Sequence, residues 1–275
     1  MTVICIKNRR IFKRKFAIVI PNYNNADWIR KCLDSVVQQD YDDYEVVVVD
    51  DMSEDASNKI IAAYSNLYRK VIHLLNTEKK FNGGTRNVGL NYIMSYMYCD
   101  YVVFLDSDDW FNDNHCLSKI AETIEKNGYP DCVSLSYNCR INGINYPQIL
   151  SRNNRQELVS SLYVACWTKV IKVDKITLFP ENTLMEDVVQ HIAQCDKLET
   201  VVSIEEPIVV WNRDNINSCS KVENQNLQQG KWQSSMYRYA ADLMDLKCNT
   251  DECEEHRKWR LDVVLNNIKD GKYIQ

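Results

Sequence analysis

Short apolar runs alternate with amphipathic segments over the first 110 residues. Residues 16–20, 46–49 and 101–105 are apolar, rich in β-branched side chains and bordered by turn formers or acidic residues, which is typical of buried strands. A further short strand is predicted at 71–75. Because no polar residue interrupts the valines of 46–49, both faces of that strand are expected to be buried, as in the centre of a parallel sheet.

Helical periodicity follows these strands. Apolar residues recur at helical spacing after Asp27, a candidate N-cap, and helices are also predicted over 57–68 and 88–98. Residues 82–87, Asn-Gly-Gly-Thr-Arg-Asn, are predicted to form the turn that leads into the last of these helices. The repeated order of strand, loop and helix predicts an α/β fold with a mostly parallel central sheet flanked by helices.

The pattern is less regular beyond residue 110. Helices are predicted over 117–127 and 186–195, and residues 225–274 have a mainly helical composition without proline. Strands are predicted over 131–137, 145–150 and 201–210.

The composition is that of a globular protein, with 45% hydrophobic and 26% charged residues among 275. The longest apolar runs are strand-sized, well short of the roughly 20 residues that cross a bilayer. The beginning of the sequence lacks the apolar stretch of a secretory signal, so we expect a cytoplasmic protein with reduced cysteines. The 11 cysteines show no metal-site spacing and are interpreted as small buried apolar residues.

Charge is distributed unevenly. Residues 1–15 contain six basic residues and no acidic one, whereas the whole chain has a net charge of −5. Such a basic arm has the charge to contact phosphates of a nucleic acid or of lipid head groups. The alternative interpretation is a solvated terminus without a partner.

Two groups of aspartates follow two of the predicted strands. Asp50 and Asp51 end the second strand, and Asp106, Asp108 and Asp109 follow the fourth. The carboxyl ends of parallel strands meet at one edge of a sheet, so these carboxylates are expected to converge. A single aspartate here would be interpreted as a turn residue or a helix cap. The convergence instead predicts a divalent cation, Mn²⁺ or Mg²⁺, with oxygen ligands and a phosphate-bearing partner.

Two nucleotide-binding classes are excluded by their motifs. The first strand is followed by Pro-Asn-Tyr-Asn-Asn, residues 21–25, and neither Gly-x-Gly-x-x-Gly nor a P-loop sequence occurs at that place. A Gly-Gly turn before a helix is a weak signal by itself, although its glycines and Arg86 suit close approach to a phosphate.

Five motifs in order resemble those of glycosyltransferase family 2, of the inverting and non-processive type with the GT-A fold. The motifs are Ile-Pro-Asn-Tyr-Asn (20–24), Val-Asp-Asp-Met-Ser (49–53), Gly-Thr-Arg-Asn (84–87), Phe-Leu-Asp-Ser-Asp-Asp-Trp (104–110) and Leu-Met-Glu-Asp-Val (184–188). The resemblance implies a metal-dependent hexosyl- or pentosyltransferase that moves a sugar from a nucleotide-sugar, with UDP the expected nucleotide, to a glycan or lipid-linked acceptor. Two alternatives stay open, a non-catalytic nucleotide-sugar-binding protein and an enzyme with a nucleic-acid acceptor held by the basic arm.

The resemblance also implies roles in donor binding. Asp51 would read the nucleobase, in a pocket lined by Pro21 and Tyr23, and Arg86 would lie near the base and phosphates. Arg213 matches the position of an arginine in a closing segment, at 211–218, that reaches the diphosphate. The alternative for Arg213 is a solvated loop residue.

The remaining roles concern the metal and the acceptor. By resemblance, Asp106 faces ribose or metal, and Asp108 holds the metal on the diphosphate. Asp187 would remove the proton from the acceptor hydroxyl, with Glu186 orienting it. Without the other motifs, these two acids would be interpreted as a charged pair on a helix face.

The expected organisation and two departures complete the picture. Met52 stands where the family commonly has glycine, and Thr85 where alanine is usual, but neither change removes a functional group. A Gln-x-x-Arg-Trp motif is absent from the sequence, which argues against a processive synthase. The domains are expected to be an arm at 1–15, a nucleotide-sugar-binding half at 16–110, an acceptor-binding half at 111–220 and a helical extension at 221–275.

Overall fold

The computed structural model describes residues 13–162, 164–181, 183, 185–218 and 229–269. Within these residues nine strands form one sheet, in the order β3-β2-β1-β4-β8-β6-β9-β5, with β7 paired to β6. The strands are β1 (Lys13–Asn22), β2 (Tyr44–Asp50), β3 (Val71–Leu75), β4 (Tyr98–Phe104), β5 (Trp110–Phe111), β6 (Cys132–Ile141), β7 (Ile144–Gln148), β8 (Lys169–Lys172) and β9 (Val201–Asn212).

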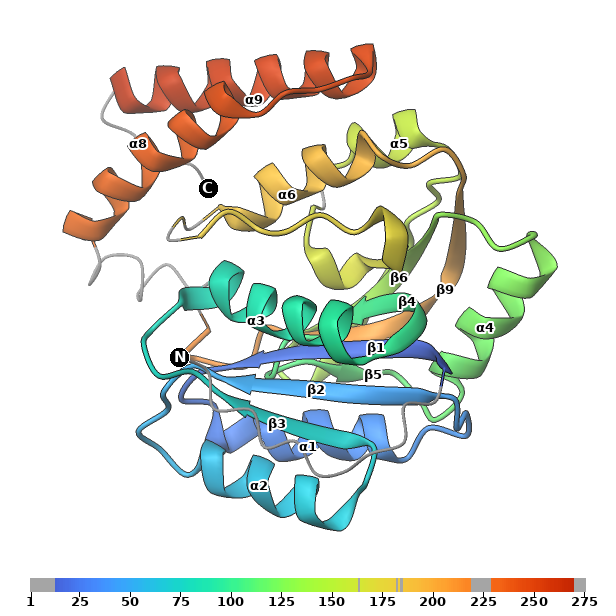
Figure 1. The fold of residues 1–275 in the computed structure, drawn as a ribbon. Helices are drawn as coiled ribbons and strands as arrows, with labels where there is room; N and C mark the ends of the chain where they lie inside the picture. Colours follow the sequence, from blue (N-terminus) through green and yellow to red (C-terminus); the bar gives the residue numbers. More distant parts are fainter. Residues whose placement is uncertain (1–12, 163, 182, 184, 219–228, 270–275) are drawn as a thin grey trace.

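Helices cover both faces of this sheet (Figure 1). Helices α1 and α2 lie on one face of the parallel strands, and α3 lies on the other. The helices are α1 (Ala26–Val37), α2 (Ser57–Leu67), α3 (Phe81–Tyr96), α4 (Cys116–Lys126), α5 (Arg155–Val159), α6 (Glu186–Cys195), α8 (Gln229–Asp245) and α9 (Asp251–Lys269).

The first half of the sheet is parallel, as the valine-rich runs predict. Strand β1 pairs in parallel with β2 and β4, and β2 pairs in parallel with β3. All four valines of β2 are fully buried because helices cover both faces of the strand. The register places Asn22 beside Asp50, so the carboxyl ends of β1 and β2 meet at one edge.

The second half of the sheet is mixed. Strand β8 is antiparallel to β4 and β6, β9 is parallel to β6, and β5 is antiparallel to β9. Helices α5 and α6 cover this half, and α8 and α9 pack on them as an outer layer (Figure 1). The helical composition after residue 225 thus corresponds to two helices that bury Tyr239, Leu243 and Val264.

Three local predictions need correction. Strand β1 continues through Pro21 to Asn22, so Pro21 lies in the strand and not in a loop. Helix α3 begins at Phe81, seven residues before the predicted start, because a positive φ at Phe81 turns the chain directly into the helix. Asp27 lies inside the first turn of α1 and is not the N-cap, which is Asn25.

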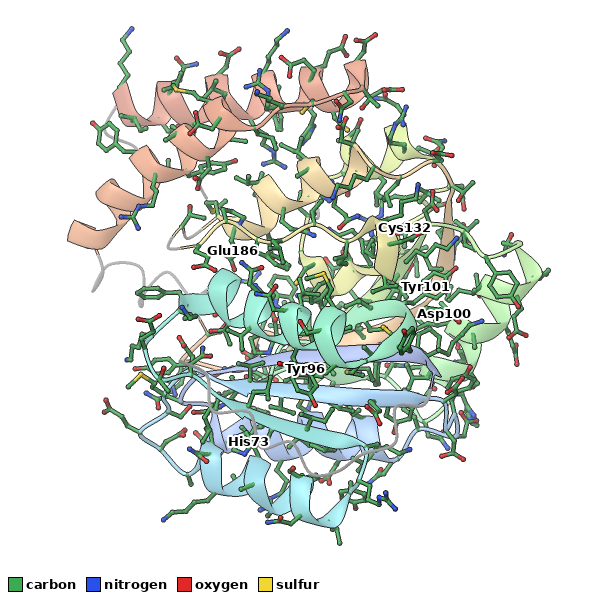
Figure 2. All side chains as sticks on the ribbon, in the orientation of Figure 1. His73, Tyr96, Asp100, Tyr101, Cys132 and Glu186 are labelled. Atoms are coloured by element: carbon green, nitrogen blue, oxygen red, sulfur yellow. The ribbon has the colours of Figure 1, made fainter. Side chains whose placement is uncertain are left out.

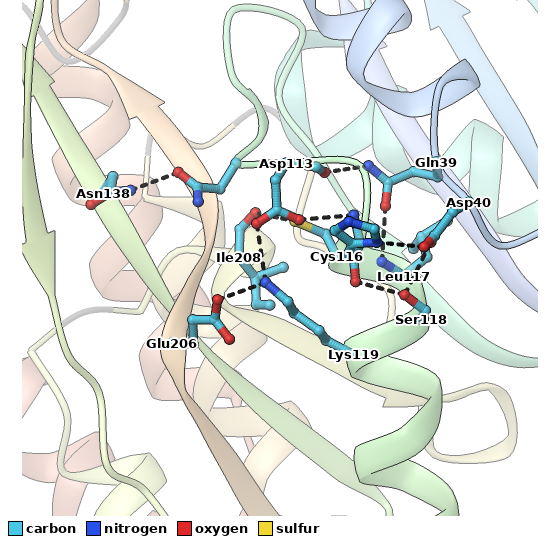
Figure 3. Close-up of polar contacts among 12 residues, drawn as sticks. Gln39, Asp40, Asp113, Cys116, Leu117, Ser118, Lys119, Asn138, Glu206 and Ile208 are labelled. Atoms are coloured by element: carbon cyan, nitrogen blue, oxygen red, sulfur yellow. Dashed lines mark hydrogen bonds and ion pairs between the residues drawn. The ribbon is translucent and has the colours of Figure 1, made fainter.

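A polar network closes the edge of the sheet opposite to the aspartates. The Gln39 side chain donates to the Asp113 carbonyl at 2.7 Å and accepts from the Leu117 amide at 2.9 Å (Figure 3). Lys119 bridges Asp113 and Glu206, at 3.0 and 2.6 Å. These bonds join the loop after α1 to the start of α4 and to β9, away from the candidate chemistry.

The cysteines behave as small core residues. The nine cysteines in the described ranges are free, and eight of them are buried. Burial raises the pKa of the Cys32 and Cys166 thiols well above the usual value, so both are held as thiols. Cys5, Cys219 and most of the basic arm lie outside the described residues.

Membrane crossing has no candidate in the described ranges. None of the helices there combines the length and the apolar character that a bilayer span requires.

Candidate active site

Asp50 locks the edge of the sheet where the candidate residues gather. The carboxylate is fully buried and accepts from the Asn22 side chain at 2.8 Å and from the Ser53 amide at 2.9 Å. It therefore ties the end of β1 to the turn after β2.

Asp51 holds the start of α3. Its carboxylate accepts from the Asn76 side chain at 2.7 Å and from the amides of Lys80 and Phe81 at 2.8 and 3.0 Å. These amides are the free donors of a helix N-terminus, which a carboxylate satisfies. One acceptor position remains on Oδ2, since a carboxylate has about four. The predicted contact of Asp51 with a nucleobase stays a prediction.

Two exposed side chains, Tyr23 and Met52, lie near Asp51. Tyr23 is 44% exposed, and its ring and hydroxyl contact the ammonium of Lys79. Pro21, by contrast, is buried in β1. Met52 is also exposed and has a φ of +63°, in the left-handed region that favours glycine. That geometry explains why glycine suits this position.

The second aspartate group is connected to β9. The Asp108 carboxylate accepts from the Asn215 side chain at 2.8 Å, and Asp109 accepts from the Asn212 amide at 2.8 Å. Burial, followed by the charge of Asp106, raises the pKa of Asp108 to about 6. Burial and the same neighbouring acids raise the pKa of Asp109 well above its ordinary value. The group therefore carries negative charge that the protein compensates poorly.

Asp106 and Asp108 suit a divalent cation. The poorly compensated charge of Asp108 is what a cation would relieve, and Asp106 uses only Oδ1 in its bond to Arg86. Carboxylate oxygens are the ligands that Mg²⁺ and Mn²⁺ prefer. No cluster of three His, Cys, Asp or Glu side chains in the described ranges forms a metal cage, so other ligands would have to come from a bound molecule. Asp109 is buried and accepts from the Asn212 amide, so it is not assigned to the cation.

Arg86 connects the two halves of the site. Only 2% of the residue is exposed, and its Nη2 donates to Asp106 Oδ1 at 2.7 Å. Its Nη1 donates to Glu186 Oε1 at 2.9 Å and lies 3.7 Å from Asp187 Oδ1. Helix α3 thus carries one cation between the aspartates after β4 and the acids of α6. The predicted contact of Arg86 with the donor is untested and stays a prediction.

The two acids of α6 face this guanidinium. Glu186 lies at the start of α6 beside the first turns of α3 (Figure 2). Burial and the charge of Asp187 raise the pKa of Glu186 to about 7. Burial also raises the pKa of Asp187, against the opposing charge of Arg86. The buried Oδ1 of Asp187 makes no hydrogen bond within the described residues and faces the guanidinium of Arg86.

Arg213 lies on the segment that follows β9. Its side chain is exposed and packs over the Trp211 ring at 4.9 Å. Asn215, two residues further, is the residue that reaches Asp108. Sequence reasoning assigned no role to Asn215, although it belongs to the aromatic-arginine segment that the motif comparison singled out. The link holds this segment against the aspartates.

A family model and several known proteins match parts of this chain. The family model described as glycosyl transferase family 2 matches residues 17–179. The glycosyltransferase GlyA of Streptococcus pneumoniae is 35% identical over 111 residues, which are 40% of this chain and 15% of that protein. The poly(ribitol-phosphate) beta-N-acetylglucosaminyltransferase TarS of Staphylococcus aureus is 30% identical over 178 residues, or 61% of this chain and 30% of TarS. The chain thus spans less than a third of the length of either relative.

Solved structures share the fold. Residues 1–349 of S. aureus TarS in complex with UDP-GlcNAc superpose with a TM-score of 0.67 at 21% identity, covering 94% of this chain and 73% of that one. The mannosyltransferase PcManGT of Pyrobaculum calidifontis, in complex with GDP-Man and Mn²⁺, gives a TM-score of 0.61 at 16% identity, covering 93% and 74%. The predicted GT-A type of α/β fold is confirmed. Since the family model matches more than half of its length, this chain belongs to glycosyltransferase family 2.

Proposed function

We propose that this chain is a metal-dependent, inverting glycosyltransferase that moves a sugar from a UDP-sugar to a hydroxyl of a glycan or other polyhydroxylated acceptor. The observation that carries the proposal is the bridge made by Arg86, which bonds Asp106 on the donor side and Glu186 on the acceptor side. Such a bridge keeps the acids of both halves within one small volume. Fixed geometry of this kind is what a displacement reaction needs.

Donor binding is assigned to the edge that β1 and β2 share. The exposed side chains of Tyr23 and Met52, next to Asp51, are assigned to the base. Asp106 and Asp108 would hold Mn²⁺ or Mg²⁺. When bound, the cation supplies charge neutralisation for the departing diphosphate. Arg213, on the segment after β9, is proposed to contact the phosphates.

Transfer is assigned to Asp187. Its carboxylate accepts the proton of the acceptor hydroxyl, whose oxygen forms the new bond to the anomeric carbon. The bond from that carbon to the diphosphate oxygen breaks in the same step, and its electron pair leaves with the nucleotide. Attack opposite to the leaving group inverts the configuration. Glu186 accepts from Arg86 and thereby fixes the start of α6.

The names of the relatives give an order in which to test acceptors. TarS is named for transfer to poly(ribitol phosphate), so this polymer comes first, followed by neutral glycans and lipid-linked sugars. A nucleic-acid acceptor has no support from the comparisons.

The experiment is a transfer assay with UDP- and GDP-sugars, with Mn²⁺ or with a chelator, followed by NMR of the product's anomeric proton. We expect Asp187→Asn to lower the rate by about a hundredfold or more, the scale of a lost general base, with donor binding retained. Glu186→Gln should be milder because its carbonyl still accepts from Arg86. Asp174→Asn, an exposed residue at the opposite edge, is the control. Retained configuration, or near-normal turnover of Asp187→Asn, would contradict the mechanism.

A further inference from the structure

A second buried cation lies behind the catalytic helix. Lys169 on β8 is 1% exposed, and its ammonium donates to the Val164 carbonyl at 2.7 Å. Its other close polar contact is Nδ1 of His191 on α6, at 3.0 Å. No ion pair found in the described ranges includes Lys169. A buried charge without a contacting counter-ion costs several kcal/mol, so its retention calls for a reason.

His191 holds this lysine through a defined tautomer. The imidazole is fully buried, and its Nε2 lies 3.1 Å from the Leu158 carbonyl, which can only accept a hydrogen bond. Nε2 therefore carries the proton, and Nδ1 accepts from Lys169. Burial, with the like charges of Lys169 and Arg152, lowers the pKa of His191 well below its usual value. The imidazole is thus neutral, and it connects β8 to α6.

The pair lies one helical turn from the proposed base. His191 follows Asp187 by four residues, so both belong to one face of α6, about 6 Å apart along its axis. The charge of Lys169 opposes the effect of burial on the pKa of Asp187. The other groups that face Asp187 are Arg86 of α3, Asp106 after β4, the Cys166 thiol and its neighbour Glu186.

We propose that Lys169 is a positioning residue for the catalytic carboxylate. Its ammonium, held by His191 of α6 and by the Val164 carbonyl, favours the ionised form of Asp187. Burial lowers the pKa of Lys169, and the negative charge of Asp187 opposes that shift, so each charge stabilises the other. The inference rests on the proposed function only in naming Asp187 as the base.

The direct test is a carbon-13 NMR titration of the Asp187 carboxyl, identified by its loss in Asp187→Asn. We expect Lys169→Met to raise the pKa of Asp187 by about one unit, since an opposite charge nearby favours the ionised form. Lys172→Met, on the same strand, should leave the titration unchanged. If the Met variant does not fold, Lys169→Gln removes the charge but keeps a donor for His191. An unchanged pKa of Asp187 in the folded variant would overturn the proposal.

Kinetics separates charge from shape. Lys169→Met should lower kcat more at low pH than at high pH, with the KM for donor unchanged, because the ionised form of Asp187 is favoured less without the ammonium. A loss that is equal at all pH values would mean a structural role and would overturn the proposal. The loss of kcat should be smaller in His191→Asn, which keeps an acceptor for Lys169, than in His191→Leu. Equal losses in the two variants would contradict the pairing of His191 with Lys169. If the wild type transfers no sugar, the proposed function fails, but the NMR titration still decides the role of Lys169.

Discussion

Arg86 shows how much one side chain organises. A planar guanidinium can donate to two carboxylates at once, and Arg86 does so across 20 residues to Asp106 and 100 residues to Glu186. The ammonium of lysine is instead a point charge that lacks this planar pair of donors. We therefore expect that no other cationic residue can replace Arg86.

We expect Arg86→Lys to lower transfer at least a hundredfold while the protein stays folded, because lysine cannot hold both acids in place. Arg30→Lys, an exposed position on α1, should have no effect on rate. Steady-state rates at saturating donor, with circular dichroism to verify folding, provide the measurement. Normal turnover of the Arg86→Lys variant would show that the bridge is dispensable.

The raised pKa of Asp108 predicts that metal binding at the proposed site depends on pH. Because its pKa is raised to about 6, a proton competes with the cation as the pH falls through that value. We expect the affinity for Mn²⁺ with UDP to be constant above pH 7 and to fall about tenfold per unit below about 6. Titration calorimetry measures it.

Asp108→Asn should abolish the metal-dependent part of UDP binding. Asp113→Asn, in the network at the opposite edge, should bind UDP and Mn²⁺ as the wild type does. Metal-dependent binding that survives in Asp108→Asn would remove this residue from the metal site.

At the scale of elements, the contact between α3 and the segment before α6 depends on a glycine. A Cβ on Gly83 would lie 2.4 Å from the Pro180 carbonyl oxygen and 3.2 Å from Cβ of Glu186. The first turn of α3 therefore approaches Pro180 and the start of α6 more closely than any other residue would allow. This contact sets the distance between α3 and α6.

Gly83→Ala is expected to cost about 1–3 kcal/mol of unfolding free energy, because backbone must shift to admit the methyl group. The transfer rate should fall by more than the loss of stability accounts for, because Glu186 moves with the backbone. Asn91→Ala, on the exposed side of the same helix, should change stability by no more than about 0.5 kcal/mol. Urea unfolding measures the stability of both variants, and a transfer assay measures their rates. A Gly83→Ala variant with unchanged stability and an unchanged rate would contradict the close packing.

At the scale of the whole molecule, the site costs stability as the pH rises. Glu186 and Asp108 have folded-state pKa values of about 7 and about 6, above the ordinary values of 4.5 and 3.8. The folded state therefore binds more protons than the unfolded state between these values, and the unfolding free energy falls as the pH rises through 6 and 7. Carboxylates with lowered pKa, such as Asp113 and Asp196, act in the opposite sense only at lower pH.

We therefore expect the Tm to decrease between pH 5 and pH 8, and to recover at pH 8 when Mn²⁺ and UDP are added. Glu186→Gln should flatten the dependence because glutamine does not titrate. Differential scanning calorimetry at four pH values measures both effects. A Tm that rises steadily from pH 5 to pH 8 would contradict the raised pKa values of Glu186 and Asp108.

Local pattern determined much of this protein. The apolar runs predicted β2 and β3, and helical spacing predicted α2, α4 and α6, because periodicity over several residues reports burial on a face. Short elements such as β5, β8 and α5 carry too few residues for a period to show. The sequence also placed aspartates after strands, and the family motifs named Asp51, Asp106, Asp108, Glu186 and Asp187 as a set.

Only the tertiary structure decided how that set is connected. Packing of α3 against the segment before α6 brings Arg86 between Asp106 and Glu186. Packing of α6 on β8 and α5 brings Lys169 to His191 and buries both. Contacts between residues so distant along the chain leave no local pattern, since they depend on which faces of distant elements meet. Burial then sets the charge of each acid, because desolvation and neighbouring ions, not residue type, shift its pKa.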